Sequence, residues 1–302
     1  MTAVATPRET RTALIQLLVA EVLIGSVGVF VRESGQDPVT AVFFRCVFGA
    51  AFLLAWGVAR GYLRGLWAER ALIRTAIISG VLLVLNWVAL FAGMARSSIG
   101  VSTLVYHFYP FAMMAMAAFF YGERTRPADL AWTGLAFAGV MLSADPLRLM
   151  HGADSTYLLG IGLTFVAAIL CGASLLLSRR IGRERPFAVV LIQCLVGVAM
   201  LAPFADHAAA LVPGWHWFWL AGLGLIHSGI CYVLFYSAYP RLHVATIAVL
   251  SFIYPVIALV LDFVLYSQVL APVQAAGVVL IAVGTLGVNL KWSWTRRVPV
   301  EA

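Results

Sequence analysis

The stretch GMARSSIGVSTLVYHFYPFAMMAMAAFFYGERTRPADLAWTGLAFAGVML (93–142) contains two long apolar runs separated by one short charged loop. The runs lie near 97–121 and 128–144, and each approaches the roughly 20 residues that an α-helix needs to cross a bilayer. Across the whole chain 63% of residues are hydrophobic and 11% are charged, whereas a soluble domain has roughly 25% charged residues. The stretch therefore predicts two membrane-spanning helices, and the composition predicts further ones.

Three similar runs precede this stretch, near 12–31, 38–59 and 71–93. Five more follow it, near 156–178, 186–205, 215–239, 244–267 and 271–291. Ten helices of about 20 residues use about 200 of the 302 residues, which leaves little chain for a soluble domain. We therefore predict an all-α membrane protein with ten transmembrane helices. Residues 1–11 are polar and no small-residue cleavage site follows the first run, so we expect no cleavable leader.

The basic residues are distributed unevenly between the two sides of this predicted topology. The outer side receives only Arg32, Arg96 and Arg148. The side that holds both termini receives fifteen, namely Arg8, Arg11, Arg60, Arg64, Arg70, Arg124, Arg126, Arg179, Arg180, Arg183, Arg185, Arg241, Lys291, Arg296 and Arg297. Cytoplasmic loops are enriched in Lys and Arg, so we expect both termini in the cytoplasm. The net charge of +7 thus reflects membrane topology, and we expect no nucleic-acid partner.

The chain repeats itself at an offset of about 145 residues. At that offset Tyr109-Pro110 falls on Tyr254-Pro255, and the same shift pairs Trp87 with Tyr232, Arg96 with Arg241 and Gly139 with Gly284. Near the start of each half an offset of 148 works better and pairs Arg45 with Gln193, Cys46 with Cys194 and Gly49 with Gly197. We interpret this run of matches as an internal duplication.

Each half holds five predicted spans, and an odd number forces the two halves into opposite orientations in the membrane. We therefore expect two inverted five-helix repeats at 12–144 and 156–291, joined by a periplasmic linker at 145–155. Residues 1–11 and 292–302 are expected to be cytoplasmic tails. Inverted repeats are typical of secondary transporters, whose substrate site lies near the midplane where the repeats meet.

The segment 93–142 also resembles the repeat of the drug/metabolite transporter superfamily, in its EamA family. The matching features are a central proline, a Gly-Glu pair, a second proline and a glycine-rich last helix, here Pro110, Gly122-Glu123, Pro127, Gly134 and Gly139. The second copy has Ser267-Gln268 in place of Gly-Glu. FFRCVFGA (43–50) is similar to the family's second helix with its arginine, Arg45.

This resemblance implies a secondary transporter in a bacterial inner membrane that works by alternating access. The subgroup that is most similar is that of the bacterial aromatic amino-acid exporters, which implies export of small metabolites, amino acids among them. Export of drugs or of other metabolites is the alternative. An intramembrane lipid-modifying enzyme is a rival from another class, but it would need clustered Asp or His residues at one interface, and this chain scatters its ionisable residues singly.

Ionisable groups inside spans are costly unless they are paired or face water, so each is a candidate functional residue. Glu21 lies midway along the first span, where it could contact a substrate amine, bind a proton or make an interhelical hydrogen bond. Arg45 could bind a substrate carboxylate, clamp helices together or reach the interface. Asp262 lies near the outer end of the ninth span, with Arg45 as a possible partner.

Uncharged polar and aromatic residues in the spans complete the candidate site. His107, His227 and Asn86 could face a substrate or could make packing hydrogen bonds, and His107 or Glu21 could carry protons. The rings of Trp87, Tyr109, Tyr232 and Tyr254 lie deeper than an interfacial belt and could line a cavity or pack the core. Pro110 and Pro255 predict helix kinks, and Glu123 beside Arg124 and Arg126 predicts a surface or gate salt bridge.

Several kinds of chemistry are not expected. The four cysteines lie inside spans without CxxC spacing, so buried free thiols are the expectation and a metal site is not. The chain contains no GxxxxGK[ST], HExxH or GxSxG motif, so we expect no ATPase site, no catalytic residues and no cofactor. The expected partners are a small-molecule substrate, the lipid bilayer and, through Glu21 or His107, protons.

Overall fold

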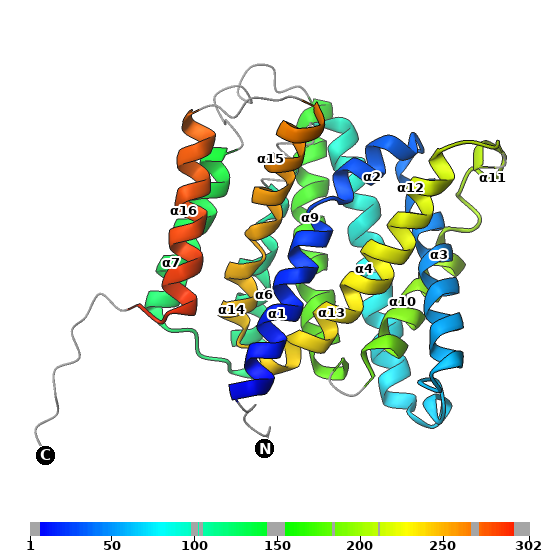
Figure 1. Ribbon diagram of the computed structural model, residues 1–302, viewed down its shortest axis with the longest axis horizontal. Coiled ribbons are helices and arrows are strands. Elements are labelled where there is room, and N and C mark those ends of the chain that lie inside the picture. The colour runs from blue at the N-terminus through cyan, green and yellow to red at the C-terminus, as the bar shows by residue number, and fades with distance from the viewer. Residues whose placement is uncertain are drawn as a thin grey trace, which may run out of the picture.

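The computed structural model describes residues 7–97, 102, 105–143, 155–182, 185–210, 212–266 and 272–292. A few side chains inside these ranges, that of Asp262 among them, lie outside the description. Within this part of the chain the ordered elements are all helices, most of which run side by side across the height of the molecule (Figure 1). The predicted all-α architecture is confirmed.

The first half of the chain holds five spans, the first and fourth of which are interrupted. The helices are α1 (Pro7–Ile24) and α2 (Val27–Ser34), then α3 (Pro38–Ala59), the short η1 (Leu66–Ala68), α4 (Arg70–Arg96), α6 (Tyr109–Tyr121) and α7 (Pro127–Ser143). Prolines begin α3 and α7, where a missing N–H costs nothing. Asp37 caps α3 by accepting hydrogen bonds from the backbone N–H groups of Val39 and Thr40.

The second half follows the same plan. Its helices are α9 (Ser155–Ile181), α10 (Pro186–Leu201), the short α11 (His207–Ala210), α12 (His216–Gly222), the π-helical η2 (Leu223–Ile230), α13 (Cys231–Ala238), η3 (Tyr239–Arg241), α14 (Val244–Leu250), α15 (Ile253–Tyr266) and α16 (Pro272–Asn289). The eighth span is therefore α12, η2 and α13 in sequence, and the ninth is α14 with α15.

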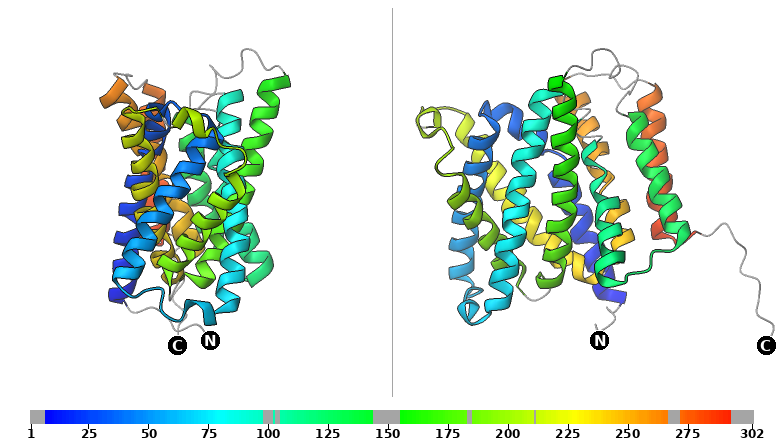
Figure 2. Two further views of the ribbon diagram at one scale, coloured as in Figure 1. Left: turned by 90° about the vertical axis from the view of Figure 1, so that its right-hand side faces the viewer. Right: turned by 180° about the vertical axis from the view of Figure 1, so that it is seen from behind.

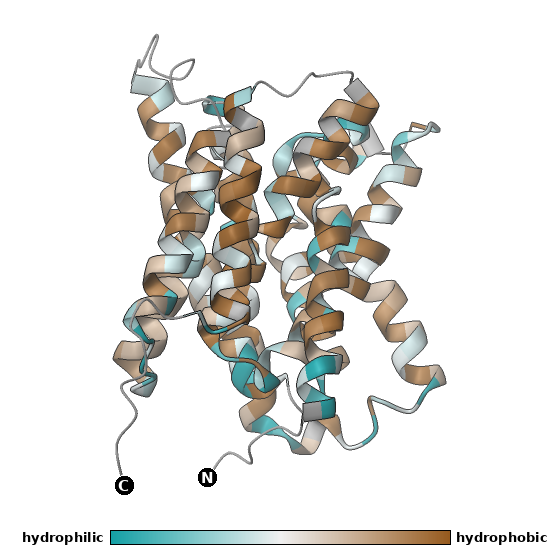
Figure 3. Ribbon diagram, turned by 60° about the vertical axis from the view of Figure 1, so that its left-hand side comes forward, coloured by the Kyte–Doolittle hydropathy of each residue, from teal (hydrophilic) through white to brown (hydrophobic). Residues whose placement is uncertain are grey.

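The outer surface of the bundle matches a lipid environment. Among the described residues, six helical segments are long and apolar enough to cross a membrane, and shorter apolar helices supply the other four spans. Large apolar side chains such as Phe119 (82% exposed) and Phe120 (66%) point away from the bundle, an exposure that water would penalise. Figure 3 shows hydrophobic residues along the middle of the helices.

The start of α1 and the end of α16 lie at the same end of the bundle (Figures 1 and 2). We call this the basic end, because its described loops and helix ends carry Arg60, Arg64, Arg70, Arg124, Arg126, Arg179, Arg180, Arg185 and Arg241. The predicted linker 145–155 and the predicted C-terminal tail lie almost wholly outside the described residues, and of the predicted N-terminal tail residues 7–11 form the start of α1, so those boundaries stay predictions.

The two halves pack on each other through reciprocal contacts. A methyl group on Gly139 of α7 would lie 2.6 Å from the carbonyl oxygen of Gly277, and one on Gly284 of α16 would lie 2.6 Å from that of Trp132. Both pairs are related by the offset of 145, since 139 corresponds to 284 and 132 to 277. An interface in which each contact recurs with the partners exchanged is the signature of two-fold symmetry.

The helices near the start of each half show the same reciprocity at the offset of 148. A methyl group on Gly49 of α3 would lie 3.1 Å from Cys194 Sγ, and one on Gly197 of α10 would lie 2.4 Å from Cys46 Sγ. The contact of Gly49 with Cys194 therefore recurs as the contact of Gly197 with Cys46, the residues at equivalent positions in the other half. The ten spans accordingly form two five-helix repeats related by a pseudo-two-fold axis. Five spans in each repeat make the relationship inverted, as predicted.

Four spans depart from straight helices. The first is interrupted at Gly25-Ser26, and the eighth contains the π-helical η2, and neither irregularity was predicted from the sequence. Close packing accounts for the glycines at these points, since a methyl group on Gly25 would meet Ile257 at 2.6 Å and one on Gly224 would meet the Gly49 backbone at 2.7 Å. The fourth span has a turn at 107–108 and the ninth has one at 251–252. These turns also occupy equivalent positions, since the offset of 145 relates residue 107 to residue 252.

Candidate functional site

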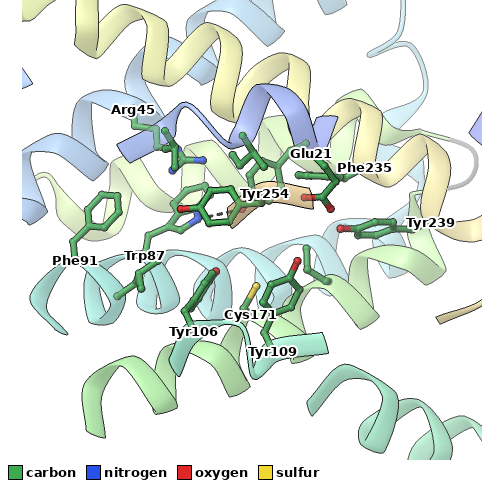
Figure 4. Close-up of a pocket in the computed structure, with 15 residues that line it drawn as sticks. Glu21, Arg45, Trp87, Phe91, Tyr106, Tyr109, Cys171, Phe235, Tyr239 and Tyr254 are labelled. Atoms are coloured by element: carbon green, nitrogen blue, oxygen red, sulfur yellow. Dashed lines mark hydrogen bonds between the residues drawn. The ribbon is translucent and has the colours of Figure 1, made fainter. Parts of the chain in front are cut away.

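A cavity of about 80 Å³ lies in the centre of the bundle, between the two repeats. It is lined by residues of seven spans or span halves: Glu21, Ile24, Val27, Arg45, Trp87, Leu90, Phe91, Tyr106, Tyr109, Cys171, Leu175, Tyr232, Phe235, Tyr239 and Tyr254 (Figure 4). Trp87 lies 17 residues into α4, or roughly 25 Å from the basic end at 1.5 Å per residue. The cavity is therefore close to mid-membrane.

Aromatic rings dominate the cavity wall. Eight of the fifteen lining residues are aromatic, and they come from both repeats. Trp87 and Tyr232 meet edge to face with 5.5 Å between ring centroids, and Trp87 Nε1 donates a hydrogen bond to Tyr232 Oη at 3.1 Å. Phe235 stacks on Tyr239 at 5.5 Å. Such a wall suits a ligand with a ring or an apolar side chain.

Arg45 supplies the positive charge of the cavity. Its side chain is 2% exposed, and its Cζ lies 4.0 Å from the centroid of the Trp87 ring, which is a cation–π arrangement. Nε donates to Ser228 Oγ at 2.7 Å and Nη2 donates to the carbonyl oxygen of His227 at 3.1 Å. A guanidinium has five N–H donors, so these two bonds fix its orientation and leave three donors for a ligand.

Glu21 supplies the negative charge. Its side chain is 1% exposed near the end of α1, and Oε1 has no hydrogen-bond partner among the described residues. No ion pair in the described part of the chain involves Glu21 or Arg45. Figure 4 shows the two side chains toward different ends of the group of rings. Among the described residues, Glu21 and Arg45 are thus the charged side chains that line the cavity, and neither forms an ion pair there.

Six of the residues predicted from the sequence line this cavity: Glu21, Arg45, Trp87, Tyr109, Tyr232 and Tyr254. Asn86, His107 and His227 do not. Asn86 is buried and its Nδ2 donates to Leu83 O at 3.4 Å. His107 lies behind the wall, with its ring stacked 5.2 Å from that of Tyr254.

His227 has a structural position in η2. Its Nε2 shares a 2.9 Å hydrogen bond with Ser26 Oγ, and its carbonyl oxygen accepts the bond from Arg45. It therefore joins the interruption between α1 and α2 to the residue that holds the positive charge. The histidine thus contacts the lining residue Arg45 without lining the cavity itself.

The remaining predicted residues lie away from the cavity. Pro110 and Pro255 stand in the first turns of α6 and α15, directly after the turns at 107–108 and 251–252, so each begins the second half of a broken span. Glu123 follows α6 at the basic end and forms an ion pair with Arg179. The side chain of Asp262 lies outside the described residues.

Sequence reasoning missed several lining residues, notably Cys171, Phe91, Phe235 and Tyr239. Tyr232, Phe235 and Tyr239 are spaced i, i+3, i+7, which places them on one helical face, so this signal was available. Tyr236 lies on another face of the same helix, where its hydroxyl donates to Gln193 Oε1 at 2.9 Å. Cys171 was expected to be an inert buried thiol, and nothing in its local sequence marks it as a lining residue.

Two inverted five-helix repeats around a mid-membrane cavity are the architecture of many secondary transporters. The sequence comparisons agree. The chain belongs to the EamA-like transporter family, whose pattern matches residues 11–144 and 158–290, one match for each repeat.

Individual relatives are transporters of different kinds. The chain is 29% identical to an uncharacterized transporter, YxxF, of Bacillus subtilis (strain 168), over 92% of this chain and 89% of that one. It is 26% identical to a probable terminal-alkyne amino-acid exporter of Streptantibioticus cattleyicolor, over 73% and 72%. It is 26% identical to the riboflavin transporter ImpX of Fusobacterium nucleatum, over 63% and 66%.

A solved structure described as "Crystal structure of protein" has the same fold, with a TM-score of 0.80 at 22% identity over 93% of this chain and 97% of that one. Together, the family and the transporter relatives point to a transporter rather than an enzyme. They leave the substrate to be argued from the cavity itself.

Proposed function

We propose that this protein exports amino acids, with a preference for those that have aromatic side chains, by alternating access across the bacterial inner membrane. The observation that carries the proposal is the pair of unpaired charges, Arg45 and Glu21, at the wall of one aromatic cavity. A free amino acid has one carboxylate and one ammonium group on a single carbon. The cavity offers one partner for each.

Arg45 is suited to the carboxylate. Guanidinium and carboxylate groups match in a planar, two-bond geometry, and the bonds to Ser228 and His227 already hold the guanidinium in place. Because three N–H donors are unused, a carboxylate can bind without displacing either of these bonds. The ligand would then add a second partner to the positive charge, beside the Trp87 ring.

Glu21 is suited to the ammonium group. A buried carboxylate without a positive partner is unfavourable in a low-dielectric site, so a ligand cation that approaches it is stabilised. The rings between and around the two charges then receive the side chain of the amino acid. The exporter relative from Streptantibioticus cattleyicolor supports this substrate class, because its name is that of an amino-acid exporter.

Alternating access is supported by the small size of the cavity. Its volume of about 80 Å³ is well below the roughly 300–1,000 Å³ of pockets that hold drug-sized ligands. An aromatic amino acid therefore needs the surrounding spans to move apart before it can enter. Two inverted repeats provide two such openings, one on each side, at similar energy. We place the basic end in the cytoplasm from the distribution of Lys and Arg.

The proposal is tested by counterflow in proteoliposomes with three ligands that share one ring. Phenylalanine has both charges, phenethylamine lacks the carboxylate, and 3-phenylpropionate lacks the amine. We expect phenylalanine to drive counterflow at concentrations about tenfold or more below either analogue, since each charged hydrogen-bonded contact contributes about 1.5–3 kcal/mol. Counterflow is also measured with riboflavin and with a cationic drug, which represent the alternative substrates.

Two variants assign the charges. Arg45→Gln should weaken the binding of phenylalanine by about tenfold or more. It should leave the binding of phenethylamine little changed, because that ligand has no carboxylate for Arg45 to bind. Glu21→Gln should show the opposite selectivity, with 3-phenylpropionate little changed. Arg60→Gln, at the exposed end of α3, is the control for a lost arginine. Strong counterflow by riboflavin or the drug, with none by any amino acid, would replace this proposal by the alternative.

A further inference from the structure

Arg179 is the centre of a contact at the basic end of the bundle, which joins several helix ends there. Its Nη1 forms an ion pair with Glu123 Oε1. Its Nε donates to the carbonyl oxygen of Tyr239 at 3.1 Å, and its Nη2 donates to that of Leu242 at 2.9 Å. All three guanidinium nitrogens are therefore engaged, and one side chain ties the ends of α6 and α9 to the connection between α13 and α14.

This contact is connected directly to the cavity. Tyr239 accepts the bond from Arg179 through its backbone, while its ring lines the cavity and stacks on Phe235. A shift of the backbone at 239 must therefore move the ring in the wall. Release of Arg179 and rearrangement of the wall are parts of one movement in this geometry.

The sequence allows this ion pair at one end of the molecule only. Shifting Glu123 forward by 145 residues gives Gln268, and shifting Arg179 back by 148 residues, the offset near the start of each half, gives Val31. The equivalent positions in the inverted repeat thus carry no opposite charges. The two ends of the transporter cannot be closed by the same interaction.

The ion pair is also placed where ligand-driven movement can break it. The side chains of Arg179 and Glu123 are 16% and 33% exposed, so the pair is partly shielded yet in reach of water. A separated pair can be hydrated at this end of the bundle, whereas separation of a fully buried pair would leave two charges without partners. The contact is therefore strong enough to hold one state and still reversible.

We propose that Arg179 and Glu123 form the latch of the cytoplasmic gate, and that its release opens the central cavity to the cytoplasm. The proposal rests on the alternating access proposed above but not on the identity of the substrate. The latch stabilises only states that are closed at the basic end. Removing it shifts the population toward states that are open there, by the free energy that the latch contributes.

Cys171 provides a reporter for this shift, because its thiol lines the cavity. The parent protein for the test carries Ala at the other three cysteines, Cys46, Cys194 and Cys231. A membrane-impermeant methanethiosulfonate reagent is applied to right-side-out and to inside-out vesicles, and the rate of Cys171 modification is measured from each side. This readout needs no substrate, so it is independent of whether amino acids are transported.

In the parent we expect slow modification from the cytoplasmic side. Glu123→Gln should raise that rate by about tenfold, because loss of the ion pair should shift the equilibrium between closed and open states by about that factor. Arg179→Lys keeps the charge but loses the three-way fork, so it should give an intermediate rate and serves if Glu123→Gln does not fold. Arg126→Gln is the matched control, because it removes an ion pair with Asp129 at the same end that joins only the residue before α7 to the first turn of that helix.

Two results would overturn the latch. One is a cytoplasmic modification rate for folded Glu123→Gln, or for Arg179→Lys in its place, that equals that of the parent and of Arg126→Gln. The other is a rise in the modification rate from the opposite side only, which would place the gate, and the basic end with it, on the wrong side of the membrane. Failure of amino-acid counterflow with a raised rate would refute the substrate and leave the latch in place.

Discussion

Trp87 donates a hydrogen bond to Tyr232, the residue that occupies the same position in the other repeat, 145 places along the chain. In a two-fold arrangement a residue contacts its own counterpart only near the axis. The pair therefore marks where the pseudo-two-fold axis passes, and both rings belong to the cavity wall. The candidate site lies on the axis, where movements of the two repeats converge.

This position predicts the role of the two rings in substrate recognition. Replacing Trp87 or Tyr232 by Ala should weaken aromatic amino acids by about two- to tenfold, since an aromatic contact contributes about 0.5–1.5 kcal/mol beyond buried area. Small aliphatic amino acids should be affected less. Competition in the counterflow assay measures both. Trp56→Ala removes an exposed ring of α3 and is the control; equal losses for both substrate classes would mean that the two rings only pack the bundle.

The reciprocal glycines predict paired effects on stability. Gly139→Ala and Gly284→Ala should each destabilise the protein by about 1–3 kcal/mol, because the added methyl group would overlap the backbone of the facing helix at 2.6 Å. The two losses should be similar, since the contacts are symmetry-related. Gly134→Ala is the control in α7, with no atom within 4 Å of the added methyl group. Thermal unfolding in detergent measures the loss of stability. An unchanged melting temperature in either variant would contradict the close packing.

The sequence was most informative about features that repeat. Offsets that paired Gly139 with Gly284 and Cys46 with Cys194 predicted equivalent positions, and equivalent positions are what an inverted fold brings together. Hydropathy predicted the spans because a bilayer imposes length and composition on every one of them. The interruption at Gly25-Ser26 and the π-helical η2 escaped prediction because they depend on contacts with Ile257 and α3 that no local pattern encodes.

For the site, polarity in a span identified candidates but not the direction in which a side chain points. Glu21 and Arg45 face the cavity, whereas the buried side chains of Asn86 and His227 bond to the helices around it. The difference is one of helix rotation, which tertiary packing sets. Asn86 directly precedes Trp87 in α4, so neighbours in sequence point about 100° apart around the axis.

The topology is open to a direct test. Single cysteines at positions 148 and 183 lie in loops that the positive-inside distribution places on opposite sides. We expect an impermeant thiol reagent applied to intact spheroplasts to modify position 148 and to reach position 183 only after the membrane is permeabilised. The reverse pattern would refute the cytoplasmic assignment of the basic end, while equal access to both positions from one side would refute the odd number of spans in each repeat.

The unpaired carboxylate of Glu21 leads to a prediction about protons. The other titratable groups around it are Tyr109, Tyr239, Cys171 and Cys231, and thiols and phenols with ordinary pKa values are neutral near pH 7. When substrate leaves, the charged carboxylate is left without its ammonium partner in an apolar site, which opposes closure of the cavity. A proton on Glu21 removes that cost, so the unloaded transporter should return with a proton in place of the substrate.

Two transport modes separate this coupling from a general effect of pH. In exchange the transporter carries substrate in both directions, whereas in net export it must return to the inward-facing state without substrate. Net export should therefore fall as the external pH rises, because fewer carriers return protonated, while exchange should change little. Glu21→Gln is neutral at every pH, so its net transport should be flat with pH and weaker for ligands with an amine. A proton ionophore should abolish concentrative transport by the parent in inside-out vesicles. Net transport that ignores both pH and the ionophore would show that Glu21 binds substrate without carrying protons.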